Sequence, residues 1–155
     1  MGDFSGDGLV NTTDIDLLAA NVGPVNGSND QFDLNDDGVI DFRSSLASPG
    51  DYDSDVLIQD LLNSNYGDAD LNGAVGDSDL TAFSQNWGMS AGWAEADWDG
   101  TGVVGDGDLT MLLTNWGWTA AVSVPEPNSA WLALSLAGFT LVRRRSYSAT
   151  FLSAA

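Results

Sequence analysis

The chain contains no cysteine and no histidine. Without cysteine it can form no disulfide, no thiolate nucleophile and no cysteine-based zinc site. Without histidine it lacks the commonest general base and the commonest ligand of transition metals. Catalytic arrangements of the Ser-His-Asp and Cys-His types are therefore excluded, and we expect no enzyme activity from these 155 residues.

Basic residues are almost as scarce. The chain has no lysine and four arginines against 23 acidic residues, which gives a formal net charge of −19. We expect no nucleic-acid binding, because phosphates require a basic surface. Repulsion among so many carboxylates opposes a compact fold unless cations offset it. Four Ca²⁺ ions would contribute +8 and reduce the charge to −11, and they would replace disulfides as staples of a small fold.

What the sequence has in abundance is a repeated acidic unit. Each of four copies begins with an Asp-rich stretch around a central glycine, continues with apolar residues at helical spacing, and ends in Asn-X-Gly. The copies, which we call units one to four, run over residues 3–23, 33–67, 68–88 and 97–117. Carboxylates at fixed offsets indicate a hard cation, and this spacing is typical of a calcium loop.

An EF-type loop takes side-chain oxygens at positions 1, 3, 5 and 12, a backbone carbonyl at 7 and often a water at 9, with glycine at 6. Counted from Asp3, Asp68 and Asp97, three loops fit this scheme throughout, and the loop counted from Asp33 fits it up to position 9. Thr101 replaces a charged ligand at position 5, so loop four is expected to be a weaker site. The predicted ligands of up to four Ca²⁺ ions are Asp3, Ser5, Asp7, Leu9, Asn11, Asp14, Asp33, Asn35, Asp37, Val39, Asp41, Asp55, Asp68, Asp70, Asn72, Ala74, Asp79, Asp97, Asp99, Thr101, Val103 and Asp108.

Loop two is interrupted. An unbroken count places Ser44 at position 12, which is a poor final ligand. The final aspartate of each other loop is followed by an apolar residue, and Asp55-Val56 has this context. We therefore predict that Asp55 closes loop two and that residues 42–54 form an insert, in which Pro49-Gly50 is a turn signal.

The apolar residues after each loop recur at the spacing of one helical face, so each unit is expected to be a loop followed by a helix of about ten residues. The fold class is therefore mostly α, built from half EF-hands in pairs. Expected N-caps are Thr12 or Thr13, Asp77 or Ser78, and Asp106, and the glycine that ends each unit is an expected C-cap. Apolar residues at position 8 are expected between paired loops, and Tyr66, Trp87 and Trp116 are expected to anchor the core.

Residues 2–117 resemble the dockerin repeat of bacterial extracellular carbohydrate-degrading systems. The resemblance implies two loop-helix units packed around two Ca²⁺ ions with pseudo-twofold symmetry, and docking onto a cohesin module. Short linkers favour pairing unit one with two (residues 1–66) and unit three with four (67–118). Thr12-Thr13 and Asp77-Ser78 partly match the cohesin-contacting pair of that family. Asp106-Gly107 does not, and the helices lack the family's Lys or Arg.

The C-terminal segment resembles a PEP-CTERM sorting signal, which has a Pro-Glu-Pro box, a membrane helix and a basic stop. Here a linker (119–128) contains Pro125-Glu126-Pro127, an apolar helix is expected over 129–145 with Arg143 to Arg145 at its end, and a disordered tail (146–155) follows. The resemblance implies an exosortase-type processing enzyme as a partner and at least transient membrane anchoring. The apolar run of about 13–15 residues is shorter than the usual span of about 20.

The leading hypothesis is a calcium-stabilised attachment module of an exported bacterial protein, at the cell surface or outside the cell. Because Met1 stands two residues before the first predicted ligand, we expect the chain to be the C-terminal piece of a longer protein or its start to be wrongly assigned. An alternative is the C-terminal tail of an extracellular polysaccharide-degrading hydrolase whose catalytic region is missing. A third hypothesis is an extended calcium stalk of the thrombospondin type, which the helical spacing disfavours.

Overall fold

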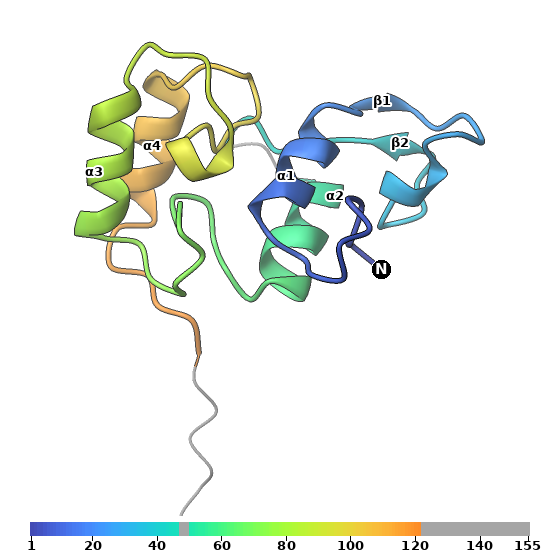
Figure 1. Ribbon diagram of the computed structural model, residues 1–155, viewed down its shortest axis with the longest axis horizontal. Coiled ribbons are helices and arrows are strands. Elements are labelled where there is room, and N and C mark those ends of the chain that lie inside the picture. Colours follow the sequence, from blue (N-terminus) through green and yellow to red (C-terminus); the bar gives the residue numbers. More distant parts are fainter. Residues whose placement is uncertain (47–49, 122–155) are drawn as a thin grey trace, which may run out of the picture. The chain divides into compact units, whose positions relative to one another are not determined.

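A helix follows each acidic loop in the computed structural model of the chain, which describes residues 1–46 and 50–121. These helices are α1 (Thr12–Ala19), α3 (Asp77–Asn86) and α4 (Asp106–Thr114). In unit two, α2 (Asp53–Asp55) continues into the π-helix η2 (Val56–Leu61). The predicted mostly α fold class is confirmed (Figure 1).

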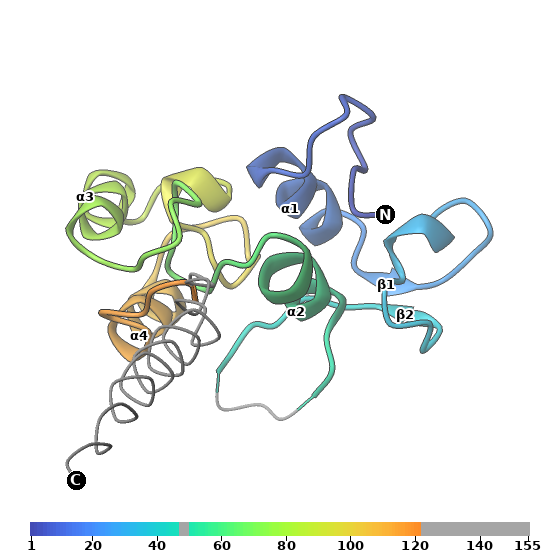
Figure 2. The ribbon, with the colours of Figure 1, turned by 90° about the horizontal axis from the view of Figure 1, so that it is seen from below.

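Short elements fill the connections. They are the strands β1 (Gly23–Pro24) and β2 (Val39–Ile40) and the 3-10 helices η1 (Asp30–Phe32) and η3 (Trp93–Glu95). The two strands pair antiparallel, with Gly23 opposite Ile40 (Figure 2). The end of unit one therefore pairs with position 8 of loop two.

The same pairing occurs twice more, reciprocally, between units three and four. Val75, at position 8 of loop three, donates its amide to the Trp118 carbonyl at 3.0 Å and accepts from the Gly117 amide at 2.9 Å. Val104, at position 8 of loop four, makes the equivalent bonds with Met89 and Gly88, at 3.0 and 2.9 Å. Each loop thus pairs with the end of the other unit, and α3 and α4 lie side by side (Figures 1 and 2).

The N-caps expected from the sequence lie one or two residues after the N-caps that the structure has. Helices α1, α3 and α4 begin at Thr12, Asp77 and Asp106, so the cap positions belong to position 9 of each loop. Asn11 caps α1 by accepting the Thr13 amide, whereas glycine holds this position in the other two helices. In all three helices the final loop aspartate accepts the backbone N–H of the cap residue. This bond is one half of a capping box, in which the carboxylate at the third helical position accepts the backbone N–H of the cap residue.

One hydrophobic core runs through units one to four, and the compact unit Met1–Ala120 contains them all. The predicted boundary between residues 66 and 67 lies inside this unit. Trp93 connects the two pairs, because its indole N–H donates to the Asp68 carbonyl at 2.8 Å and its amide donates to Asp16 of α1 at 2.7 Å. Tyr66 lies beside it, with ring centroids 5.8 Å apart.

The expected anchoring role of the three aromatic residues holds for only one of them. Tyr66 is fully buried, but Trp87 and Trp116 are 49% and 45% exposed. Among the tryptophans that the structure describes, the fully buried ones are Trp93 and Trp98, which the repeat pattern did not single out. Equivalent places in a repeat therefore have different surroundings, because Tyr66 meets the second pair while Trp87 and Trp116 face solvent.

The predicted linker, membrane helix and tail lie almost entirely outside the described residues, which end at Ala121. No helix within residues 1–46 and 50–121 has the length and apolar character needed to span a bilayer.

We expect Trp93→Ala to lower the free energy of unfolding by about 3–5 kcal/mol, because it removes a fully buried side chain and orphans the Asp68 carbonyl. Trp87→Ala is the matched control and should cost about 1 kcal/mol or less, since half of that side chain is exposed. Urea unfolding followed by circular dichroism measures both. Equal losses from the two variants would contradict the placement of Trp93 in the core.

Candidate metal centre

All four loops share one backbone turn. Position 6 is glycine with φ between +83° and +90° in every loop, as the loop pattern requires. Position 4 is also left-handed in every loop, with φ between +53° and +74°, although Leu71 and Asp36 occupy it in loops three and two. The pattern of ligands did not predict this second turn. Its recurrence with unfavourable residues shows that the four loops have the same local conformation.

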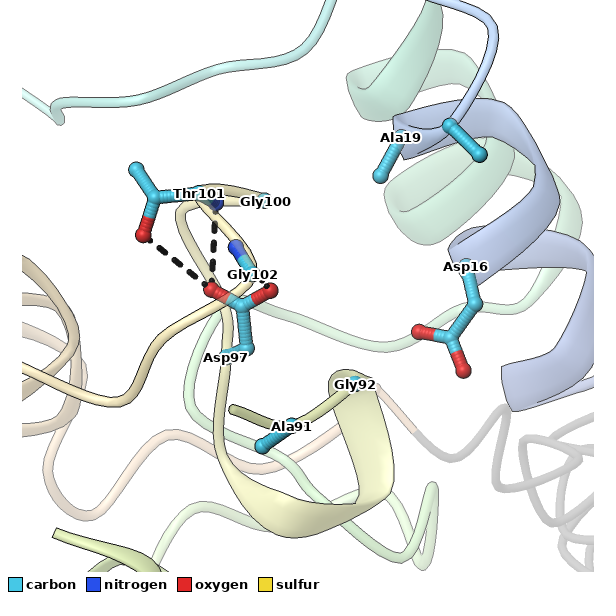
Figure 3. A pocket seen from close by; sticks show the side chains of 9 residues that line it. Asp16, Ala19, Ala91, Gly92, Asp97, Gly100, Thr101 and Gly102 are labelled. Carbon is cyan, nitrogen blue, oxygen red and sulfur yellow. Dashed lines mark hydrogen bonds between the residues drawn. The ribbon is translucent and has the colours of Figure 1, made fainter. Parts of the chain in front are cut away.

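The first aspartate of each loop is fixed by the same hydrogen bond. Its Oδ2 accepts the amide of the glycine at position 6, at 2.9 Å in loops one and four and 3.0 Å in loops two and three. In loop four, Oδ1 of Asp97 also accepts the Thr101 amide at 3.1 Å (Figure 3). These bonds curl the loop around the carboxylate at position 1.

The final aspartate of each loop holds the loop against its helix. One oxygen of Asp14 accepts the amides of Phe4 and Ser5 at 2.8 and 2.9 Å, and the other accepts the Asn11 amide at 2.9 Å. Asp108 makes the equivalent bonds to Trp98, Asp99 and Gly105. Asp79 bonds to Ala69 and Gly76. All three carboxylate residues are fully buried.

The structure corrects the predicted closing residue of loop two. Asp53, not Asp55, accepts the amides of Leu34 at 2.6 Å and Asn35 at 3.2 Å, and its other oxygen accepts the Asp41 amide at 2.8 Å. It is fully buried, like its counterparts. Asp55 instead forms an ion pair with Arg43. The insert is therefore residues 42–52, two residues shorter than predicted.

A different sequence signal identifies Asp53. The residue four positions after each final aspartate is a buried apolar side chain, because it lies one helical turn further on the same face. These residues are Leu18, Leu57, Phe83 and Leu112. Four residues after Asp55 stands Gln59, which is exposed. The apolar residue directly after the aspartate, which favoured Asp55, is a weaker guide.

Two loops gather enough carboxylates to hold a metal ion. Asp68, Asp70 and Asp79 in loop three each place an oxygen within 4.8 Å of the others, and so do Asp97, Asp99 and Asp108 in loop four. Within the described residues, loops one and two form no such three-carboxylate group, although their first and last aspartates make the same amide bonds. The two acidic clusters could therefore each hold a cation.

The other predicted ligands lie along the same turns. At position 3, the side-chain oxygens of Asn35, Asp70 and Asp99 each accept the amide of position 5, while the Ser5 hydroxyl donates to Asp3. At position 5, the side chains of Asp7, Asp37 and Asn72 accept the amides of Leu9, Val39 and Ala74. The Thr101 hydroxyl lies 3.3 Å from the Val103 carbonyl, the backbone oxygen predicted as a ligand. At position 9, Asn11 caps α1 and Asp41 accepts the Asp53 amide.

Burial makes these carboxylates costly to ionise without a cation. The pKa of Asp97 is raised to about 6, chiefly by loss of water and also by the charges of Asp108 and Asp99, against the opposing Gly102 hydrogen bond. Burial likewise raises the pKa of Asp53, Asp68 and Asp108. A divalent ion would remove this penalty, since opposite charge favours the ionised form.

The donor set fits a hard cation. Carboxylate, amide, hydroxyl and backbone oxygens are the ligands of Ca²⁺ and Mg²⁺, whereas the nitrogen and sulfur ligands of Zn²⁺ are not available in this chain. A cavity of about 400 Å³ beside loop four is lined by Asp16 of α1 and by Asp97 and Thr101 (Figure 3). Because Asp97 belongs to loop four, we treat this cavity as part of the surroundings of that loop.

Comparison of the chain with models of protein families, with curated proteins and with solved structures finds no match in any of the three. The loop geometry therefore carries the functional argument.

Asp53→Ala removes the carboxylate that closes loop two. We expect it to abolish cation binding at this loop or to lower the affinity by at least about tenfold. Ser44→Ala, at the exposed residue reached by an unbroken count, should leave every site unchanged. Isothermal titration calorimetry with CaCl₂ compares the two. A greater loss from Ser44→Ala would show that loop two closes without Asp53.

The metal-free protein should lose stability as the pH rises. A carboxyl whose pKa is raised by folding contributes stability that is fully present below its unfolded value of 3.8 and is lost as the pH passes its folded value, about 6 for Asp97. We expect a loss on the order of 1–2 kcal/mol between pH 4.5 and pH 7 in chelator-treated protein. Added Ca²⁺ should reverse the trend, because the ion binds the ionised carboxylates. Urea midpoints with and without Ca²⁺ test both signs, and a midpoint rising with pH in the metal-free protein would contradict them.

Proposed function

We propose that the chain is a calcium-binding attachment module, in which bound Ca²⁺ holds paired loop-helix units in the conformation that a partner recognises. The observation that carries the proposal is the repeated carboxylate geometry. The four loops have the same backbone turn. In each loop, backbone amides of that loop donate hydrogen bonds to the carboxylate oxygens of the first and the last aspartate. The sequence offers the aspartates of the loops almost no positive side chain that could take the place of a cation, because Arg43 is the only basic residue before Arg143.

Calcium is favoured over other cations by the chemistry of the donor atoms and by the number of oxygen ligands in each loop. The loops offer more than four oxygens each, counting side chains and the carbonyl at position 7, which suits the six to eight ligands of Ca²⁺ better than the rigid octahedron of Mg²⁺. Loops three and four would bind first, because each gathers three carboxylates. This order replaces the expectation from Thr101 that loop four is a weaker site. Ca²⁺ is abundant outside cells, which agrees with an exported protein.

The attachment role rests on the dockerin resemblance and on the pairing of units. Reciprocal backbone bonds between units three and four support the two-loop, two-helix arrangement implied by that family. Large apolar side chains remain exposed on α3 and α4 and just after them, as a surface for a protein partner such as a cohesin-like module. They are Leu80, Trp87, Leu113 and Trp116. The helices offer no Lys or Arg to such a partner, so its contacts would be apolar and polar.

The C-terminal signal completes the proposal. Residues 125–145 would anchor the exported chain in the membrane until an exosortase-type enzyme processes it, with Arg143 to Arg145 on the cytoplasmic side. The module itself would perform no chemistry, and any catalytic activity would belong to another part of a longer protein.

Titration of CaCl₂ into the chelator-treated full chain should increase helix content and slow proteolysis, because clustered carboxylates repel one another in the metal-free state. MgCl₂ at the same concentration is the matched control and should give a much smaller change. Far-UV circular dichroism measures the helix content, and limited digestion with papain, which needs no calcium, measures the protection from proteolysis. A spectrum that is the same with excess chelator and with saturating Ca²⁺ would refute coupling between calcium and folding.

A further inference from the structure

Loop two faces a problem that the other loops do not have. In loops one, three and four, two residues separate position 9 from the final aspartate, so the chain itself delivers that carboxylate. In loop two, residues 42–52 stand between Asp41 and Asp53. A longer connection makes the return of the final carboxylate less probable, because loop-closure entropy grows with length. Some other contact must offset this loss if loop two is to keep the geometry of its neighbours.

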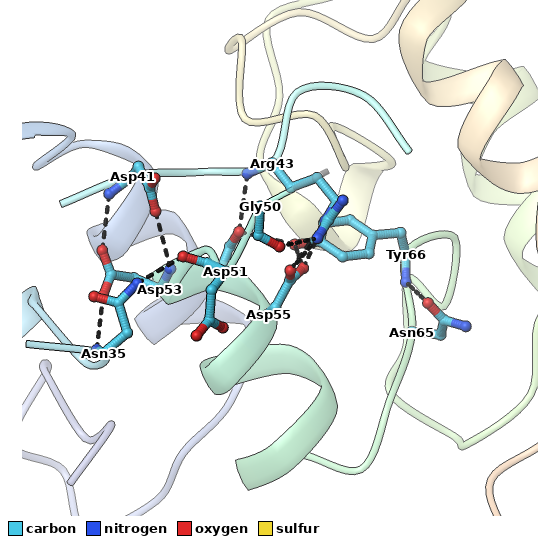
Figure 4. Close-up of polar contacts among 10 residues, drawn as sticks. Asn35, Asp41, Arg43, Gly50, Asp51, Asp53, Asp55, Asn65 and Tyr66 are labelled. Atoms are coloured by element: carbon cyan, nitrogen blue, oxygen red, sulfur yellow. Dashed lines mark hydrogen bonds and ion pairs between the residues drawn. The ribbon is translucent and has the colours of Figure 1, made fainter. Parts of the chain in front are cut away.

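The ends of the insert are joined by a ladder of side-chain bonds (Figure 4). Asp41 and Asp53 exchange amide-to-carboxylate bonds of 2.8 and 3.0 Å. Two residues further along each segment, Arg43 and Asp55 form an ion pair. Between these rungs, the Arg43 amide donates to Ser54 Oγ at 2.9 Å. The ladder thus places the residues that follow position 9 beside those that follow the final aspartate.

The Arg43 guanidinium is held from several sides. Its Nε donates to both oxygens of Asp55, at 2.8 and 3.1 Å, and its Nη2 contacts the same carboxylate and the Gly50 carbonyl. The Tyr52 ring lies 4.5 Å from the guanidinium carbon. The buried Tyr66 hydroxyl lies 2.8 Å from Asp55 Oδ1. A two-pronged arginine–carboxylate contact with both side chains about 13–14% exposed fixes direction as well as distance.

We infer that Arg43 is a positioning residue for the cation site of loop two: its contact with Asp55 closes the insert and thereby brings Asp53 to the loop. This inference rests on the proposed calcium function and deepens it. Arg43 does not bind the ion. It replaces the short covalent connection of the other loops, and it is the only basic residue available before Arg143 to do so.

Each loop contains a reporter that allows its site to be observed separately. The amide of the glycine at position 6 donates to the first aspartate of its own loop, and these glycines are Gly8, Gly38, Gly73 and Gly102. Their amide resonances, followed by ¹H–¹⁵N NMR during a CaCl₂ titration of the full chain, report the four sites in parallel. Gly38 reports loop two.

Arg43→Ala should shift the calcium midpoint at Gly38 upward by roughly tenfold, the factor expected for lengthening the closure from two residues to eleven. The midpoints at the other three glycines should stay within about twofold. Arg43→Lys, which keeps the charge but loses the two-pronged contact, should recover part of the loss. An unchanged Gly38 midpoint in Arg43→Ala would overturn the inference. Equal shifts at all four glycines would also overturn it, because they would show a general effect on stability.

A shortened variant provides an independent measurement. Replacing residues 42–52 by the Asp-Ser connection of loop three, together with Asp55→Asn, removes both the insert and the need for Arg43. Gly38 should then titrate with a midpoint close to that of the unmodified chain. A midpoint as weak as that of Arg43→Ala would contradict the positioning role.

The metal-free protein separates this inference from the calcium function. Hydrogen exchange at the Asp41 amide, which donates to Asp53, should be slowed in the unmodified chain and at least about tenfold faster in Arg43→Ala, while the Asn11 amide of loop one stays unchanged. If no glycine responds to Ca²⁺ in the unmodified chain, the proposed function fails, and this exchange measurement still decides whether Arg43 positions Asp53. Equal exchange of the Asp41 amide in both proteins would overturn the inference.

Discussion

Every unit of this fold depends on one buried carboxylate that binds two parts of the chain at once. In each loop the final aspartate accepts at least one amide from the start of the loop and another from position 9. It therefore closes the loop and, in α1, α3 and α4, completes the first turn of the helix. A neutral amide side chain of the same shape could accept some of these bonds, but a carboxylate can accept on both oxygens and also offer charge to a cation. One group thus closes the loop and starts the helix, and in loops three and four it also belongs to a cluster that could hold a cation.

This arrangement explains how so acidic a chain can be compact. The final aspartates are buried because they make the hydrogen bonds that organise the loops, and burial raises the pKa of those in loops two and four, Asp53 and Asp108. Their hydrogen bonds recover part of the free-energy cost of desolvation. The part that remains is the cost of keeping negative charges buried close to one another. A chain with a formal charge of −19 and one basic residue before Arg143 has little means of its own to offset that remainder. Cations held by the acidic clusters of loops three and four could offset it, and the residues that would hold them are the same ones that shape the loops.

The sequence predicts what is local and repeats, and it fails where the outcome depends on distant contacts. Loops and helices follow from offsets within about 20 residues, so the repeat pattern identified them and the mostly α class correctly. The closing residue of loop two depends on Arg43 and Asp55, which meet across an insert, and the local context of Asp55-Val56 was misleading. The burial of the aromatic residues also depends on contacts with residues outside their own unit. Tyr66 and Trp87 hold the same place in the repeat, but only Tyr66 lies against Trp93.

The two pairs show two ways of reaching one loop geometry. Units three and four exchange backbone bonds at Val75 and Val104 and need only short connections. Unit two carries an insert, and its loop has the same left-handed turns and the same buried final carboxylate. Loop two can have the geometry of the other loops despite its longer connection only if another contact compensates. That contact must be strong and directional, because a weak contact could not restrict the longer segment. In a chain without cysteine, an arginine–carboxylate pair is the contact that meets both conditions, and the ion pair of Arg43 with Asp55 stands where the connection was lengthened.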